Sequence, residues 1–169
     1  RVAKDDPRIV AYGTVDELNA CIGLVRDRNT RYGDDESARA RLDELLEAVQ
    51  QQLFNLGSSL ATRIEERRDG QPLVTADHVE ELEVLIDTLN EELEPLMSFV
   101  LPGGGPVGAM LHLARTVCRR AERATLSLSR AETIDANDLR YLNRLSDALF
   151  VMGRWIAKRQ GEPEPLWTP

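Results

Sequence analysis

The sequence predicts an all-α fold, a five-helix up-and-down antiparallel bundle, from three observations. Apolar residues recur with helical spacing along nearly all of the 169 residues, and no strand-like alternation competes with this pattern. Prolines and glycines gather in a few short segments that separate the long periodic stretches. Aromatic residues make up only 5% of the chain, which favours helices over sheets. The length fits a single domain over residues 1–169.

Each expected helix has recognisable start or stop signals. Pro7 suits the first turn of the first helix, while Thr75 and Asp135 are N-cap residues for the third and fifth. Two prolines keep the segment Gly161–Pro165 out of any helix. The expected helices cover residues 7–28, 35–63, 76–95, 107–130 and 136–159.

Charge and composition exclude several classes of protein. A net charge of −8 argues against a nucleic-acid-binding protein, which would present a broad basic face. No apolar run approaches the roughly 18 residues that a membrane span needs, and no signal peptide is visible. Cys21 and Cys118 stand singly within helical patterns, which predicts small buried thiols in a reduced cytoplasmic protein.

The histidines do not have the spacing of a metal site. Residues Thr75 and Ala109, three positions before His78 and His112, are not the glutamates of a ferritin-like di-iron site. No cysteine–histidine cluster for zinc exists either. We therefore expect no resident metal ion.

The most informative segment is a stripe of arginines in the fourth expected helix. Arg115, Arg119 and Arg123 recur every four residues, so they lie on one face and repel each other. They form either an ion-paired surface or a clamp for a polyphosphate or carboxylate, since guanidinium groups donate paired hydrogen bonds to such anions. Glu122 has the spacing to pair with Arg119 and hold it in position.

Two other features, one polar and one built around a glycine, each allow two interpretations. Asn143 and Asp147, one turn apart on the fifth helix, are either a surface edge or a pair that faces a nucleotide or another subunit. Gly13 costs about 1 kcal/mol relative to alanine in a helix, which indicates close packing at this position. Asp16, one turn further along, has the position to meet an arginine of another helix or subunit.

The glycine-rich loop Leu101–Pro106 lacks the Gly-Lys-Ser/Thr of a P-loop, so a flexible connector is favoured. Its flexibility would still let Phe99 move against a large planar ligand.

Four blocks of sequence together resemble the ATP:cob(I)alamin adenosyltransferases of the propanediol-utilisation type. The blocks span residues 1–4, 12–19, 99–104 leading to 114–123, and 141–147, and they follow the family's order over almost the whole chain. Any one block is a weak signal, whereas the four in order are specific. The resemblance implies a bundle of this family assembled as a homotrimer with active sites between subunits.

The resemblance also implies roles for individual residues. Lys4, Arg119 and Asn143 should contact ATP, with Glu122 and Arg123 supporting the site. Arg115 should pair across the subunit interface with an acid, for which Asp16 is the best candidate. Phe99 should lie beside the corrin ring and displace its lower axial base.

The implied reaction transfers the 5′-deoxyadenosyl group of ATP to cob(I)alamin, with Mg²⁺ on the triphosphate. It implies a cob(II)alamin reductase and a B12-dependent acceptor enzyme as possible partners. The family's nucleotide-loop segment would precede Arg1 and is missing from the sequence, which starts after it. A cobalamin or nucleotide carrier without turnover, and a structural bundle with a surface arginine stripe, are the alternatives.

Overall fold

A computed structural model of the chain describes residues 3–168 and contains five α-helices. In the described residues the only strand-like pairing is an isolated bridge between Val100 and Leu166. The elements in order are α1 (Pro7–Asn29), α2 (Glu36–Ala61), the short 3-10 helix η1 (Ile64–Glu66), α3 (Ala76–Asn90), α4 (Gly105–Ser129) and α5 (Ala136–Arg159). The all-α five-helix prediction is confirmed.

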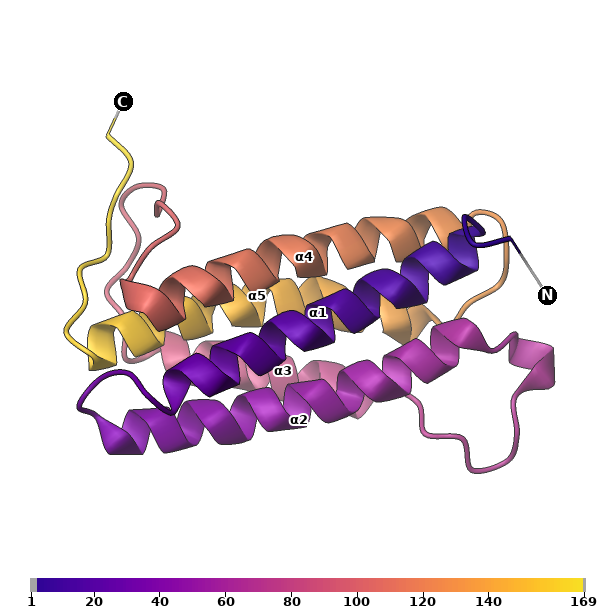
Figure 1. The fold of residues 1–169 in the computed structure, drawn as a ribbon, viewed down its shortest axis with the longest axis horizontal. Helices are drawn as coiled ribbons and strands as arrows, with labels where there is room; N and C mark the ends of the chain where they lie inside the picture. Colours follow the sequence, from indigo (N-terminus) through magenta and orange to yellow (C-terminus); the bar gives the residue numbers. More distant parts are fainter. Residues whose placement is uncertain (1–2, 169) are drawn as a thin grey trace.

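Helices consecutive in sequence run in alternating directions, but the packing order differs from the sequence order (Figure 1). The first helix, α1, packs against both α2 and α4, and α4 packs against α5. The third helix, α3, packs mainly on α5 and runs parallel to it. Arg144 of α5 contacts Glu83 of α3, and Lys158 contacts the Glu92 carbonyl beyond the end of α3. The bundle is therefore antiparallel except where α3 covers α5.

The predicted N-caps are present, whereas some predicted ends differ. Asp135 caps α5 by accepting from the Asn137 backbone N–H, and Thr75 precedes α3 as expected. The third helix ends at Asn90, not at Pro95. Lys158 and Arg154 of α5 donate hydrogen bonds to backbone carbonyl oxygens of the segment that follows it, in place of helical N–H groups.

The ends that face the two long loops also differ from the predictions. The second helix ends at Ala61 instead of Arg63, where Arg8 of α1 donates to the Leu60 carbonyl. The fourth helix begins at Gly105, two residues earlier than predicted, after a left-handed Gly104 at φ 78°. Glycine tolerates this conformation without a steric cost.

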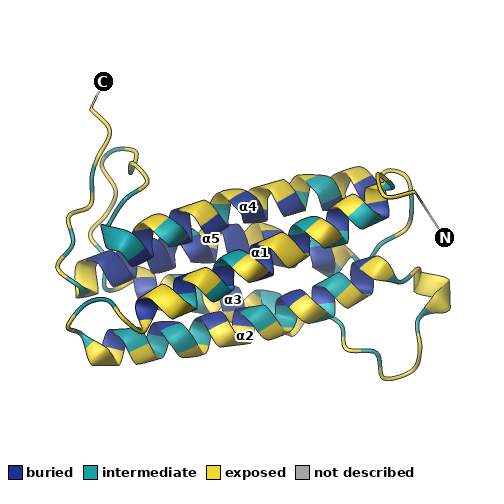
Figure 2. Cartoon of the chain, viewed as in Figure 1, coloured by how far each residue is buried: buried dark blue, intermediate teal, exposed yellow. Residues whose placement is uncertain are grey.

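The apolar core is continuous along the bundle and centres on α5 (Figure 2). Every residue from Val151 to Ala157 is buried, so this part of α5 is surrounded on all sides. Gly108 and Gly153 let α4 and α5 approach closely, since a Cβ on Gly108 would lie 3.3 Å from the Gly153 carbonyl.

Both cysteines are free, and Cys118 is buried, while Cys21 is only half-buried, contrary to prediction. No helix in residues 3–168 is long and apolar enough to cross a membrane.

Candidate active site

The arginine stripe lies along α4 and is not neutralised within the described chain. Arg119 and Arg123 are exposed and Arg115 is half-buried. None of the three forms an ion pair with a described carboxylate, whereas the adjacent Arg120 pairs with Glu17 of α1 at 2.5 Å. Within the described part of one chain the stripe is therefore not ion-paired, and its positive charge remains available to an anion.

Arg115 has unused hydrogen-bonding capacity. Its Nε is buried and has no partner among residues 3–168. A buried guanidinium N–H without an acceptor is costly, so such groups are normally satisfied. Burial and the charge of Arg115 lower the pKa of His112, one turn earlier on α4. A neutral His112 leaves Arg115 as the charged group at this position.

Asp16, the predicted partner of Arg115, lies elsewhere in the same chain. It is exposed on α1 and forms no ion pair with Arg115 or with any other described cation. It lines a groove of about 390 Å³ between α1 and α2. Gly13 lines the same groove, and a Cβ added to it would meet no atom within 4 Å, so the close packing expected there does not occur within one chain.

Glu122 and Asn143 are joined across α4 and α5. The Asn143 side chain donates from Nδ2 to Glu122 Oε1 at 2.9 Å. The predicted pairing of Glu122 with Arg119 is absent, because the carboxylate is half-buried at the α4–α5 boundary and bonds to the facing helix. Asp147 accepts from Arg144 at 3.3 Å. The arginine donors of α4 thus lie beside a carboxylate–amide pair that joins α4 to α5.

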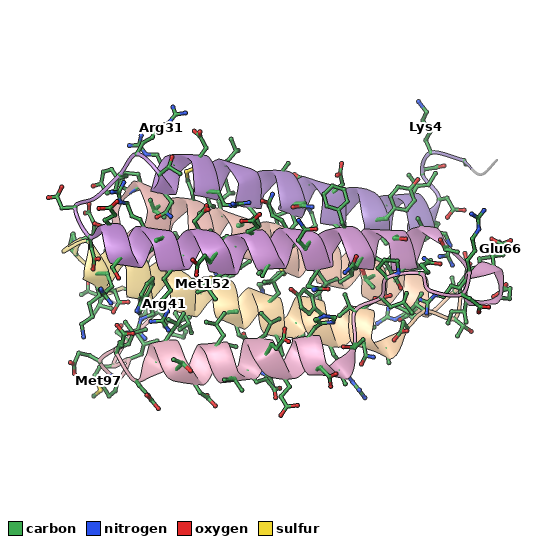
Figure 3. The ribbon with its side chains drawn as sticks, turned by 90° about the horizontal axis from the view of Figure 1, so that it is seen from below. Lys4, Arg31, Arg41, Glu66, Met97 and Met152 are labelled. Carbon is green, nitrogen blue, oxygen red and sulfur yellow. The ribbon has the colours of Figure 1, made fainter. Side chains whose placement is uncertain are left out.

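Lys4 and Phe99 lie at opposite ends of the bundle. Figure 3 shows Lys4 at one end and Met97, from the loop that carries Phe99, at the other. The helix α4 between these ends has 25 residues, so its axis is roughly 37 Å long. Phe99 is 79% exposed. Within one chain the structure brings Arg119, Arg123, Glu122 and Asn143 to one region, but leaves Lys4, Phe99 and Asp16 apart from them.

Sequence reasoning missed one residue of the groove beside Asp16. Phe54 of α2 lines the groove and is 69% exposed, which is unusual for a large aromatic side chain. It lies off the buried stripe of Leu53, Leu56 and Leu60. That offset was visible in the sequence as an apolar residue on a polar helix face.

The described residues contain no group of three His, Cys, Asp or Glu side chains that could hold a metal ion. The acidic group near the stripe is Glu122. One carboxylate together with phosphate oxygens is a donor set that Mg²⁺ commonly accepts, so this region fits a magnesium ion carried by a nucleotide.

These features define a helical bundle that offers a polyanion an unneutralised arginine stripe beside a carboxylate–amide pair. The family model described as cobalamin adenosyltransferase matches residues 1–156, and the chain belongs to that family. Of the four blocks that carry the resemblance, only the first extends beyond the described residues, at positions 1 and 2.

Named relatives and solved structures agree with this family. The chain is 41% identical to the corrinoid adenosyltransferase of Mycobacterium tuberculosis, covering 100% of this chain and 84% of the relative. It is 38% identical to human corrinoid adenosyltransferase MMAB, covering 99% of this chain and 66% of the relative. A variant PduO-type ATP:corrinoid adenosyltransferase from Lactobacillus reuteri, complexed with cobalamin and ATP, superposes with a TM-score of 0.90 at 34% identity, covering 99% of this chain and 90% of that one.

Proposed function

We propose that this protein transfers the 5′-deoxyadenosyl group of ATP to cob(I)alamin. Cobalt(I) supplies the electron pair that forms the cobalt–carbon bond at C5′, the C5′–oxygen bond breaks, and inorganic triphosphate leaves. The observation that carries the proposal is the arginine stripe on α4, which no described carboxylate neutralises. Family membership and the ATP and cobalamin bound by the Lactobacillus reuteri relative support the same reaction.

The chain's role at the leaving group is electrostatic. Arg119, with Lys4 from a second subunit, would bind the triphosphate as negative charge develops on it, and Arg123 would add to the positive field. Asn143, fixed by Glu122, would contact the nucleotide. Mg²⁺ near Glu122 would neutralise part of the phosphate charge when ATP is bound. Displacement by cobalt(I) needs no protein base, since no proton moves to or from carbon.

Phe99 would act on the corrinoid. Cob(II)alamin is hard to reduce while an axial ligand donates electron density to cobalt. An apolar ring placed on that face excludes the ligand and water, so the single electron from a reductase is accepted more easily. Phe99 suits this role because its ring is exposed at the end of the bundle and available to a planar ligand.

The active site would lie between subunits of a homotrimer. Lys4 and Met97, whose loop carries Phe99, lie at opposite ends of one chain (Figure 3), so one chain alone does not bring Lys4 and Phe99 to the same ATP and corrin. Among the described residues, Arg115 Nε has no acceptor and the Asp16 carboxylate has no cation, so each would satisfy the other across an interface. Exposed apolar side chains on α1, α2 and α4 would be covered by the same contact, namely Val10, Leu24, Phe54 and Leu113. A cytoplasmic location and a B12-dependent acceptor enzyme remain predictions.

The test is an anaerobic assay of cob(I)alamin loss with ATP and Mg²⁺. Formation of a light-sensitive adenosylcobalamin spectrum with release of triphosphate would establish the reaction. Arg119→Ala should reduce kcat by about 10²–10³, the usual cost of removing one donor from a developing charge. Arg31→Ala is the matched control, because Arg31 is exposed and pairs only with Asp27 one turn away among the described residues.

Two other results would change the assignment. ATP that protects the protein against thermal unfolding without any conversion would indicate a nucleotide or cobalamin carrier. If ATP gives neither protection nor conversion, only the interpretation as a structural bundle remains.

A further inference from the structure

The loop that carries Phe99 is held by the C-terminal segment of the chain. The Leu101 backbone N–H donates to the Pro165 carbonyl at 2.8 Å, and the Trp167 N–H donates to the Phe99 carbonyl at 2.8 Å. Ser98 Oγ donates to the Trp167 carbonyl at 2.7 Å. These bonds form a short antiparallel pairing between segments that are far apart in the sequence.

The side chains of the two segments also meet. The rings of Phe99 and Trp167 pack edge to face, with centroids 6.2 Å apart and an interplanar angle of 71°. Pro165 packs against Gly103, where an added Cβ would lie 2.8 Å from the proline Cγ. The position of the Phe99 ring is therefore coupled to where the C-terminal segment lies.

One buried arginine fixes both segments to α5. Arg154 is 7% exposed, and its Nε donates to Glu164 Oε1 at 2.5 Å. Its Nη2 donates to Glu164 Oε2 at 3.2 Å and to the Glu94 carbonyl at 2.9 Å. Glu164 belongs to the C-terminal segment and Glu94 lies in the loop that leads from α3 to Phe99, so a single guanidinium joins three parts of the chain.

The geometry of this contact requires an arginine. A planar guanidinium binds both carboxylate oxygens and a carbonyl at once, which the ammonium group of lysine cannot do with the same directions. The pair also adds little net stability, because Arg154 loses water on burial while Glu164 stays partly exposed to solvent. The contribution of the Arg154–Glu164 pair is instead that it selects one arrangement of the segments that it joins.

We propose that Arg154 is a positioning residue, which sets the place of the Phe99 ring by fixing the C-terminal segment against the loop. This inference rests on the corrinoid role proposed for Phe99. Arg154 does not touch a substrate in this scheme. It acts through Glu164, the backbone pairing, and the Trp167 ring.

Hydrogen exchange on the full chain tests the first step without any turnover. In Arg154→Lys, the amides of Leu101 and Trp167 should exchange about tenfold faster or more, while amides in the middle of α4 keep their rates. Glu164→Gln should give the same pattern. Because Glu164 is the more exposed partner of the pair, this variant tests the proposal even if Arg154→Lys folds poorly. Arg26→Lys is the matched control, because Arg26 of α1 forms its ion pairs with Asp43 and Glu47 of α2, away from both segments. Unchanged exchange at Leu101 and Trp167 in both variants would overturn the proposal.

The second step is tested by comparing two substrates. Arg154→Lys should lose more activity with cob(II)alamin and a reductase than with pre-reduced cob(I)alamin, as Phe99→Ala should. Combining Arg154→Lys with Phe99→Ala should add little to the loss caused by Phe99→Ala alone. Protection by ATP against unfolding should be retained. Equal losses of activity on both substrates would refute the positioning role. A wild-type chain that transfers no adenosyl group would instead refute the proposed function. In that case the exchange experiment alone would decide whether Arg154 holds the loop.

Discussion

The carboxyl group of Asp138 makes the stability of this fold depend on pH. It lies in the first turn of α5 and is 1% exposed. Its Oδ2 accepts from Ser59 Oγ at 2.7 Å, and its Oδ1 has no partner among the described residues. Arg67, whose charge acts on Asp138, donates from Nη2 to Ser59 Oγ at 2.6 Å and not to the carboxyl group. Burial raises the pKa of Asp138 to about 7 from its ordinary 3.8.

The direction of this pH dependence follows from the number of protons bound by the folded and by the unfolded protein. Between pH 4 and pH 7 the folded protein keeps a proton on Asp138 that the unfolded chain releases, so stability falls as the pH rises. A shift of this size corresponds to about 4 kcal/mol of lost stability above pH 7, of which about 3 kcal/mol disappears between pH 5 and pH 8.

Asp138→Asn removes the titration and keeps both the shape and an acceptor for Ser59. We expect the variant to gain about 2–3 kcal/mol over the wild type at pH 8 and much less at pH 5. Urea unfolding followed by circular dichroism at the two pH values measures this difference. Asp87→Asn, at an exposed position of α3, is the control for a simple change in net charge. A gain that is equal at both pH values, or a loss at pH 8, would refute the reasoning.

Three further predictions concern packing and assembly. Gly108→Ala should destabilise the fold by about 2–3 kcal/mol in urea unfolding, since the added Cβ would lie 2.8 Å from a backbone carbonyl oxygen. Gly23→Ala should instead stabilise the fold by about 0.5–1 kcal/mol, because the atom nearest to its added Cβ is 3.6 Å away. Thr125→Val should be neutral or stabilising by about 1 kcal/mol in thermal melts, because the buried hydroxyl has no described partner; a large loss would reveal an unseen one. Asp16→Asn should weaken the proposed homotrimer in sedimentation experiments, and a fully assembled, fully active variant would refute the pairing with Arg115.

Much of the candidate site could be located from the sequence but not assembled from it. The arginine stripe needed only the spacing of residues on one helix. The partner of Glu122 could not be found in the same way, because Asn143 is on the next helix and the contact depends on how α4 and α5 pack. The same limit applies to Arg154, whose hydrogen bonds reach Glu94 and Glu164 in two other segments.

The sequence by itself determined the number of helices, their apolar faces, the caps at Thr75 and Asp135, and the family. These follow from signals that act within a few residues, such as helical periodicity and side-chain hydrogen bonds to nearby N–H groups. The tertiary structure alone decided that α3 packs on α5 and ends at Asn90, and that the C-terminal segment pairs with the loop of Phe99. Those features depend on contacts between distant segments, whose free energy is gained only once the helices have packed together.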